Sequence, residues 1–157
     1  MKQNIIICCG ISGSGKSTYS TELCRLDSNY RRINRDDLRK QLVGTLEGYY
    51  KRIDINSLEK NVTELLKLQC DYLLKKSYNL IIDNTHLSIK YLNEIQLAYE
   101  SKANITIKTF NCDLEVAKRR ILKRDFNCAT NDEIITDQRV AYINKQYQQY
   151  QELIKKL

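Results

Sequence analysis

The 157-residue sequence contains no proline and no tryptophan, and it has only five glycines and a single histidine. Because no proline-rich or low-complexity segment marks a linker, we expect one domain spanning residues 1–157. A chain of this length hides about 68–70% of its unfolded surface on folding, so it can bury a substantial core. The longest apolar run near the start, Ile5 to Cys9, is far too short to cross a bilayer. We therefore expect no export signal and no membrane partner.

Metal-ligating patterns are also absent. The six cysteines include no C-x-x-C pair, and one histidine cannot complete a zinc site. We interpret the cysteines as free thiols and expect a reducing, cytoplasmic compartment. Acidic residues are outnumbered, and the net charge of +7 favours anionic partners, although a lysine-rich soluble surface explains the same charge.

Short apolar runs alternate with longer helical patterns, which is typical of βαβ units and a parallel sheet. The expected strands are residues 4–9, 30–34, 80–83 and 104–110, and the expected helices are 16–26, 37–43, 57–76, 88–102, 114–124 and 131–156. The stretch between Val43 and Ser57 has two glycines and no clean period, so it reads as a loop or broken helix that forms a candidate substrate-facing flap. In the last helix, Val140, Ile143, Tyr147, Tyr150 and Ile154 form an apolar stripe, which predicts core packing.

The segment GISGSGKS, Gly10 to Ser17, matches the G-x-x-x-x-G-K-S phosphate loop and lies between an expected strand and an expected helix. Its glycines let backbone amides turn toward phosphate oxygens, and the helix adds its positive N-terminal end. Lys16 should reach the β and γ phosphates, Ser17 should offer its hydroxyl to Mg²⁺, and Thr18 should lie beside the α phosphate. The expected ligands are ATP or another nucleoside triphosphate and Mg²⁺. The predicted nucleotide-binding residues are Gly10, Ser12, Gly13, Ser14, Gly15, Lys16, Ser17, Thr18, Arg120 and Arg124.

Asp83 ends the third apolar run and should lie at the carboxyl edge of the sheet, where ligands of open α/β sheets bind. It could hold Mg²⁺ through water, orient a neighbouring side chain, or cap the next turn. A guanine-specific switch protein would carry N-K-x-D, and the nearest sequence, NKQY at Asn144, lacks the acid. The sequence therefore argues against a GTPase.

The segment RINRDDLRKQL places an acid pair between arginines some twenty residues after the phosphate loop. In a helix, Arg35, Asp36 and Arg39 share one face. A carboxylate there can accept a proton from an attacking alcohol, and the arginine fork can fix a second anionic group. The alternative is that Asp36 or Asp37 caps the helix and Arg39 makes a solvated surface pair.

Two late arginines, Arg120 and Arg124, lie one helical turn apart and precede the polar segment 125–132, which we interpret as a lid. Arginines that close over the γ phosphate stabilise charge on the transferred group. The alternative is a solvated basic helix end, which the helix dipole favours.

Taken together, the alternating strands and helices, the phosphate loop and the late arginines predict a three-layer α/β fold of the P-loop kinase type. We expect a roughly four-stranded parallel sheet flanked by helices, and a helical lid.

The chain resembles the 5′-hydroxyl polynucleotide kinase family, the phage-type end-healing P-loop kinases. The resemblance rests on GISGSGKST, INRDDLR, IIDNTHL and the spaced pair Arg120 and Arg124, and it spans Ile5 to about Arg124. The first motif departs from the family's glycine–proline opening, and Asp83 with Asn84 stands where phage members have their Asp.

The resemblance implies an ATP-dependent kinase that acts on the 5′-hydroxyl ends of DNA or RNA. Lys16 and Ser17 would bind ATP and Mg²⁺, Asp36 would be the general base, Arg39 would hold the phosphate next to the terminal nucleoside, and Arg124 would contact the transferred phosphate. The residues expected at the acceptor are Arg35, Asp36, Arg39, Asn84 and Thr85. Two alternatives stay open: a P-loop kinase of a small alcohol such as a nucleoside or sugar acid, and a nucleotide-binding module without phosphotransferase activity. A homo-oligomer also stays open.

Overall fold

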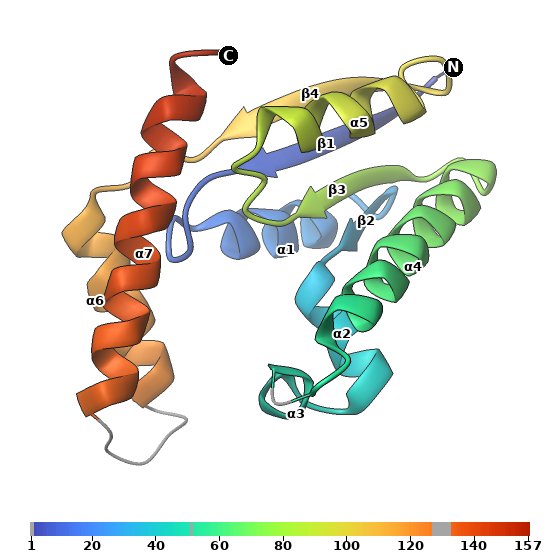
Figure 1. Cartoon of the computed structure of the whole chain (residues 1–157). Coiled ribbons are helices and arrows are strands. Elements are labelled where there is room, and N and C mark those ends of the chain that lie inside the picture. The colour runs from blue at the N-terminus through green and yellow to red at the C-terminus, as the bar shows by residue number, and fades with distance from the viewer. Residues whose placement is uncertain (1, 51, 127–132) are drawn as a thin grey trace.

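The computed structural model of the chain describes residues 2–50, 52–126 and 133–157 (Figure 1). Its sheet is built from β1 (Gln3–Cys9), β2 (Tyr30–Ile33), β3 (Asn79–Asp83) and β4 (Ala103–Thr109). All pairings are parallel and the strand order is β2-β3-β1-β4. Ile5 of β1 lies opposite Leu80 on one side and Ile105 on the other. The predicted four-stranded parallel sheet is therefore confirmed.

Central and edge strands differ in burial as their positions require. Ile5, Ile7, Ile81 and Ile82 have no exposed surface, because helices cover both faces of a parallel sheet. In β4, which pairs with β1 alone in the part of the chain that the structure describes, Asn104, Thr106 and Thr109 are exposed. The polar positions on β4 fit an edge strand.

Three of the helices that lie between the strands form the outer layers. Helix α1 (Lys16–Leu26) packs on β2 and β3, α4 (Ile55–Lys75) packs on the same two strands, and α5 (Ile89–Tyr99) packs on β4. Right-handed crossovers place α1 on one face and place α4 and α5 on the other, because the first crossover moves along the sheet in the opposite direction from the other two (Figure 1). In α4 the buried residues recur every four positions, at Val62, Leu66, Cys70 and Leu74. The three-layer P-loop kinase-type architecture is confirmed.

The segment after β2 bends twice before α4 begins. Helix α2 (Arg35–Val43) ends at Gly44, whose φ of 84° favours glycine, and the one-turn helix α3 (Leu46–Tyr50) follows. The prediction of a broken helix between Val43 and Ser57 is therefore confirmed.

Helices α6 (Leu114–Phe126) and α7 (Glu133–Ile154) pack against each other beside the carboxyl ends of the strands (Figure 1). The predicted stripe of α7 is only partly right. Among residues 137–154, whose burial the structure describes, the buried residues are Ile143, Gln146, Tyr150 and Leu153, whereas Val140, Tyr147 and Ile154 are half-buried. The predicted irregular lid at 125–132 is wrong at its start, because α6 continues through Phe126. The remaining residues of that lid, 127–132, lie outside the described residues.

Five cysteines within the described ranges, Cys8, Cys9, Cys24, Cys70 and Cys112, are free thiols, as expected. Among the helices of residues 2–50, 52–126 and 133–157, none combines the length and the apolar character needed to cross a bilayer.

Candidate active site

The phosphate loop joins β1 to α1 and is shaped by glycine. Gly13 and Gly15 have φ values of 79° and 96°, and Gly15 is the N-cap of α1. A Cβ on Gly13 would lie 2.8 Å from the carbonyl oxygen of Ala117 in α6, so the loop packs directly against that helix. Gly10 is equally tight, since a Cβ there would lie 2.9 Å from the carbonyl oxygen of Phe110. Larger side chains at these positions would displace the loop.

Lys16, the first residue of α1, folds back over the phosphate loop. It is only 7% exposed, and its ammonium group donates to the Ile11 carbonyl at 2.7 Å. Burial lowers the pKa of Lys16, and the charge of Asp83 partly opposes this. Ser17 and Thr18 are exposed on the first turn of α1. The predicted phosphate-binding residues therefore lie together at one helix N-terminus, where anions are stabilised.

Two helices from the end of the chain contact this loop. The Arg120 guanidinium of α6 donates to the Gly13 carbonyl at 3.1 Å, and the Ser12 amide donates to the side-chain carbonyl of Gln146 in α7 at 2.8 Å. Arg124 lies one turn further along α6 and is exposed. Sequence reasoning missed Gln146, although a glutamine within an otherwise apolar stripe is a detectable signal of a buried polar contact.

Asp83 ends β3 with a buried carboxylate. It is 1% exposed, and its Oδ2 accepts from Nε and Nη2 of Arg32 at 2.7 Å. Its other oxygen, Oδ1, is buried and has no hydrogen-bond partner among the described residues. The Asp83 carboxylate therefore binds Arg32 and, within the described ranges, accepts no hydrogen bond from the turn that follows it, which argues against a capping role.

The unsatisfied Asp83 Oδ1 bears on the predicted magnesium ion. A buried carboxylate oxygen without a partner is costly, and it fits a ligand that supplies a cation or an ordered water. Mg²⁺ is held through one or two protein oxygens together with substrate phosphates and waters, so a single carboxylate and the Ser17 hydroxyl meet its requirements. The residues present therefore fit the ion.

Helix α2 carries the acid pair and is anchored to the end of β3 by Asn34. The Asn34 side-chain oxygen accepts from the amides of Asp36 and Asp37, at 2.9 and 3.2 Å, and its side-chain nitrogen donates to the Asp83 carbonyl. The interpretation of Asp36 or Asp37 as the helix cap is therefore wrong, because Asn34 has that role. Both carboxylates are left to make side-chain contacts.

The two acids bind different arginines. Asp36 Oδ1 accepts from Arg39 at 2.6 Å, and Asp37 Oδ2 accepts from Arg32 at 2.6 Å. Asp36 is half-exposed, whereas Arg39 is mostly buried. The prediction that Asp36 and Arg39 share one face of α2 is confirmed. The alternative, a solvated surface pair, is wrong for Arg39, because its side chain is mostly buried.

Glu59 of α4 was missed by sequence reasoning. One of its oxygens accepts from Nε of Arg39 at 2.8 Å, and the other accepts from Nη2 of Arg39 at 3.1 Å and from Arg35 at 2.8 Å. Burial disfavours its charge, but the hydrogen bonds from both arginines lower the pKa of Glu59 to about 2. Burial likewise opposes the charge of Arg39, whereas Glu59 and Asp36 hold the pKa of Arg39 above its ordinary value. No motif marks Glu59, because the contact joins helices twenty residues apart.

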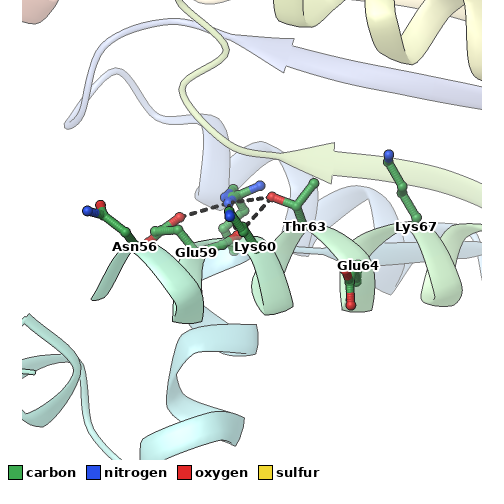
Figure 2. A pocket seen from close by; sticks show the side chains of 7 residues that line it. Asn56, Glu59, Lys60, Thr63, Glu64 and Lys67 are labelled. Carbon is green, nitrogen blue, oxygen red and sulfur yellow. Dashed lines mark hydrogen bonds and ion pairs between the residues drawn. The ribbon is translucent and has the colours of Figure 1, made fainter. Parts of the chain in front are cut away.

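Arg35 is more enclosed than expected for an acceptor-binding residue. Besides Glu59 it donates to the hydroxyls of Thr63 and Tyr91, at 3.1 and 3.3 Å. A hollow of about 420 Å³ is lined by Arg35, Glu59, Thr63, Glu64 and Lys67, among others. Figure 2 shows Glu59 and Thr63 side by side on α4. Arg35 thus holds α2 against α4.

The other two predicted acceptor residues follow β3. The Asn84 side-chain oxygen accepts from the Arg35 amide at 2.9 Å, and its side-chain nitrogen is buried without a partner among the described residues. The Thr85 carbonyl accepts from the Gly10 amide at 3.0 Å. The segment after β3 therefore ties the phosphate loop to the start of α2.

These contacts join a glycine-rich loop, a buried strand-end acid and an acid–arginine pair at the carboxyl edge of one sheet. A sequence profile described as the AAA domain matches residues 5–150. The chain belongs to the AAA domain family. Because its phosphate loop joins β1 to α1 at the carboxyl edge of a parallel sheet, this AAA domain has the P-loop fold found in nucleotide-binding proteins.

The AAA domain is also similar to named proteins. Over 146 residues it is 28% identical to a candidate bifunctional polynucleotide kinase/RNA ligase of Autographa californica nuclear polyhedrosis virus. The matching region covers 87% of this chain and 20% of the viral protein. A chain in the solved Pnkp1/Rnl/Hen1 RNA repair complex is 28% identical, with a TM-score of 0.83 over 99% of this chain and 46% of that chain. A second structure of the Pnkp1/Rnl/Hen1 complex is 29% identical, with a TM-score of 0.64 over 83% of this chain and 40% of that one. The AAA domain thus spans less than half of each relative.

Proposed function

We propose that the chain is a polynucleotide kinase that transfers the γ phosphate of ATP to the 5′-hydroxyl end of DNA or RNA. The observation that carries the proposal is the half-exposed Asp36 carboxylate, held by Arg39 on a helix that hydrogen bonds to the end of β3. A protein that only binds nucleotides has no need of such an acid. The names of the viral relative and of the RNA repair complex support the same substrate class.

The donor half of the mechanism uses the phosphate loop. The amides of residues 10–17 and the N-terminus of α1 bind the β and γ phosphates, and the Lys16 ammonium compensates their charge. Ser17 and, through water, Asp83 would hold Mg²⁺, which would supply positive charge to the phosphates of the donor. Arg120 and Arg124 of α6 stabilise charge on the phosphoryl group during transfer.

The acceptor half uses α2. The oxygen of the 5′-hydroxyl bonds to the γ phosphorus while the bond between the γ phosphorus and the β-phosphate oxygen breaks. The Asp36 carboxylate accepts the proton that the hydroxyl loses. Arg39 keeps Asp36 oriented through one N–H, and Glu59 takes two more of its five N–H groups. The remaining N–H groups of Arg39 can bind the phosphate on the 3′ side of the terminal nucleoside.

The test compares two small acceptors that differ only by that phosphate. A nucleoside 3′-monophosphate should be phosphorylated at its 5′-hydroxyl roughly tenfold to a hundredfold better, in kcat/KM, than the free nucleoside, because charge-assisted hydrogen bonds contribute about 1.5–3 kcal/mol. Arg39→Ala should remove this preference and also lower kcat, since Asp36 loses its partner. Lys40→Ala, on the exposed side of the same helix, is the matched control and should retain the preference.

The same assay, run with labelled γ phosphate on 5′-hydroxyl oligonucleotides and sugars, separates the other functions. Oligonucleotides should gain only modest, salt-sensitive affinity from the basic surface. A preference near one for the monophosphate, with efficient transfer to a sugar, would replace the proposal with a small-alcohol kinase. Absence of transfer to any acceptor, with ATP still bound, would leave a nucleotide-binding module.

A further inference from the structure

Tyr50, at the end of α3, exposes a large aromatic side chain next to the acid–arginine pair. It is 54% exposed, although the adjacent Tyr49 is completely buried. The two rings meet edge to face, with centroids 5.6 Å apart and planes at 85°. Because Tyr49 anchors the single turn of α3 in the core, Tyr50 is held at the surface. An exposed ring with a rigid support is preorganised to receive a flat ligand.

The ring lies where an acceptor would be bound. The Arg39 guanidinium carbon is 5.9 Å from the centroid of Tyr50, and the same guanidinium binds Asp36. Burial raises the pKa of Tyr50, the charge of Arg39 lowers it, and the charges of Asp36, Tyr142 and Glu59 raise it. Tyr142 comes from α7 and is also exposed. The exposed Tyr50 ring therefore lies beside the arginine that binds the proposed proton acceptor.

The chemistry of the acceptor identifies what would occupy this surface. In the terminal nucleoside of a strand, the 5′-hydroxyl and the base are attached to the same ribose. When the 5′-hydroxyl is bound at Asp36, the base of that nucleoside is therefore within reach of the Tyr50 ring. Aromatic rings stack on all four bases because every base has a π face, which gives affinity without sequence preference. We propose that Tyr50 is the stacking platform for the terminal nucleobase of the acceptor. The proposal rests on the polynucleotide kinase function and extends it to a base-binding subsite.

The experiment uses two 5′-hydroxyl oligonucleotides that are identical except that one carries a tetrahydrofuran abasic residue at its 5′ end. Stacking of one base contributes about 1–3 kcal/mol, so the unmutated protein should prefer the complete strand by roughly 5- to 150-fold in kcat/KM. Tyr50→Ala should bring this ratio close to one by lowering activity on the complete strand alone. Tyr50→Phe retains the ring and should keep the ratio.

A matched control comes from α4, where Tyr72 is 61% exposed and lies 5.9 Å from the Lys76 ammonium, much as Tyr50 lies beside Arg39. Tyr72→Ala should keep the ratio of the unmutated protein. If Tyr50→Ala lowers activity equally on both strands, Tyr50 only supports Arg39 and the stacking proposal is overturned. A ratio near one in the unmutated protein overturns the stacking subsite and leaves the kinase function intact, whereas lack of transfer to either strand overturns both.

Discussion

At the scale of single residues, Asp36 and Asp37 are neighbours with different partners, so they should have different effects when changed. Asp36→Asn keeps the side-chain shape and the Asn34 cap but removes the proton acceptor, and general-base help contributes about a hundredfold to ten-thousandfold. We expect kcat to fall by that factor with little change in the KM for ATP. Asp37→Asn weakens the contacts to Arg32 and Lys40 and should be milder. Steady-state kinetics of both variants is the measurement.

Equal losses in the two variants would contradict the assignment of Asp36 as the base. Such a result would indicate that both acids contribute through α2 and its contacts rather than through proton transfer. Thermal unfolding of the two variants is the control, because similar Tm values separate a loss of chemistry from a loss of helix stability.

Glu59 gives a prediction about stability and pH. Its pKa is about 2 in the folded protein and about 4.3 in an unfolded chain, so folding favours its ionised form. The stabilisation is fully present above the unfolded pKa and is lost as the pH falls toward 2. We therefore expect Glu59→Gln to lower the free energy of unfolding most above about pH 4.5, with the deficit shrinking at lower pH. Urea unfolding between pH 3 and pH 7 measures it, and a deficit independent of pH would contradict the ion-pair explanation.

At the scale of elements, α6 is seated on the phosphate loop. Ala117 touches Gly13, and Arg120 binds the Gly13 carbonyl, so the helix direction sets where Arg124 lies. Charge on the γ phosphoryl group is redistributed during transfer, so an arginine aimed there stabilises the transition state more than the ground state. Arg124→Ala should therefore lower kcat more than it raises the KM for ATP.

Arg119→Ala is the matched control for α6. Arg119 is exposed and lines a hollow between α6 and α7 together with Glu115, Leu122 and Val140, so its loss should leave kcat unchanged. A change in the KM for ATP alone in Arg124→Ala would mean that Arg124 binds ATP equally well before and during transfer.

At the scale of the whole molecule, the sequence predicted those features that depend on residues close together in the chain, such as the bounds of helices. Helix α1 begins and ends as predicted, because a phosphate loop with glycine at the helix entry leaves little choice. Helix α2 starts two residues earlier than predicted, because Asn34, not an acid, caps it. The placement of the phosphate loop and the start of α2 at the same edge of the sheet followed from the rule that parallel strands present their carboxyl ends at one edge.

The rest of the site depends on contacts between distant segments. Glu59 of α4 and Gln146 of α7 lie on helices that the amphipathic pattern located, but that pattern does not state which polar side chain on the boundary faces another element. Helix rotation is set by packing of buried residues, such as Val62 and Ile143, and a shift of one position exchanges the side chain that reaches the site. Single-sequence reasoning therefore located the motifs that meet at the carboxyl edge of the sheet and missed Glu59 and Gln146, which bind residues of those motifs.

The Asn34 side chain has a consequence for which amino acids this position accepts. It uses the two ends of one amide for opposite tasks: the oxygen receives the first amides of α2, and the nitrogen reaches the Asp83 carbonyl. Aspartate has the same size and caps helices equally well, yet its second oxygen would face a carbonyl oxygen and repel it. Serine could cap the helix but is too short to bridge. The amide works as a spacer of fixed length and polarity, so that the end of a strand and the first turn of a helix move as one rigid piece.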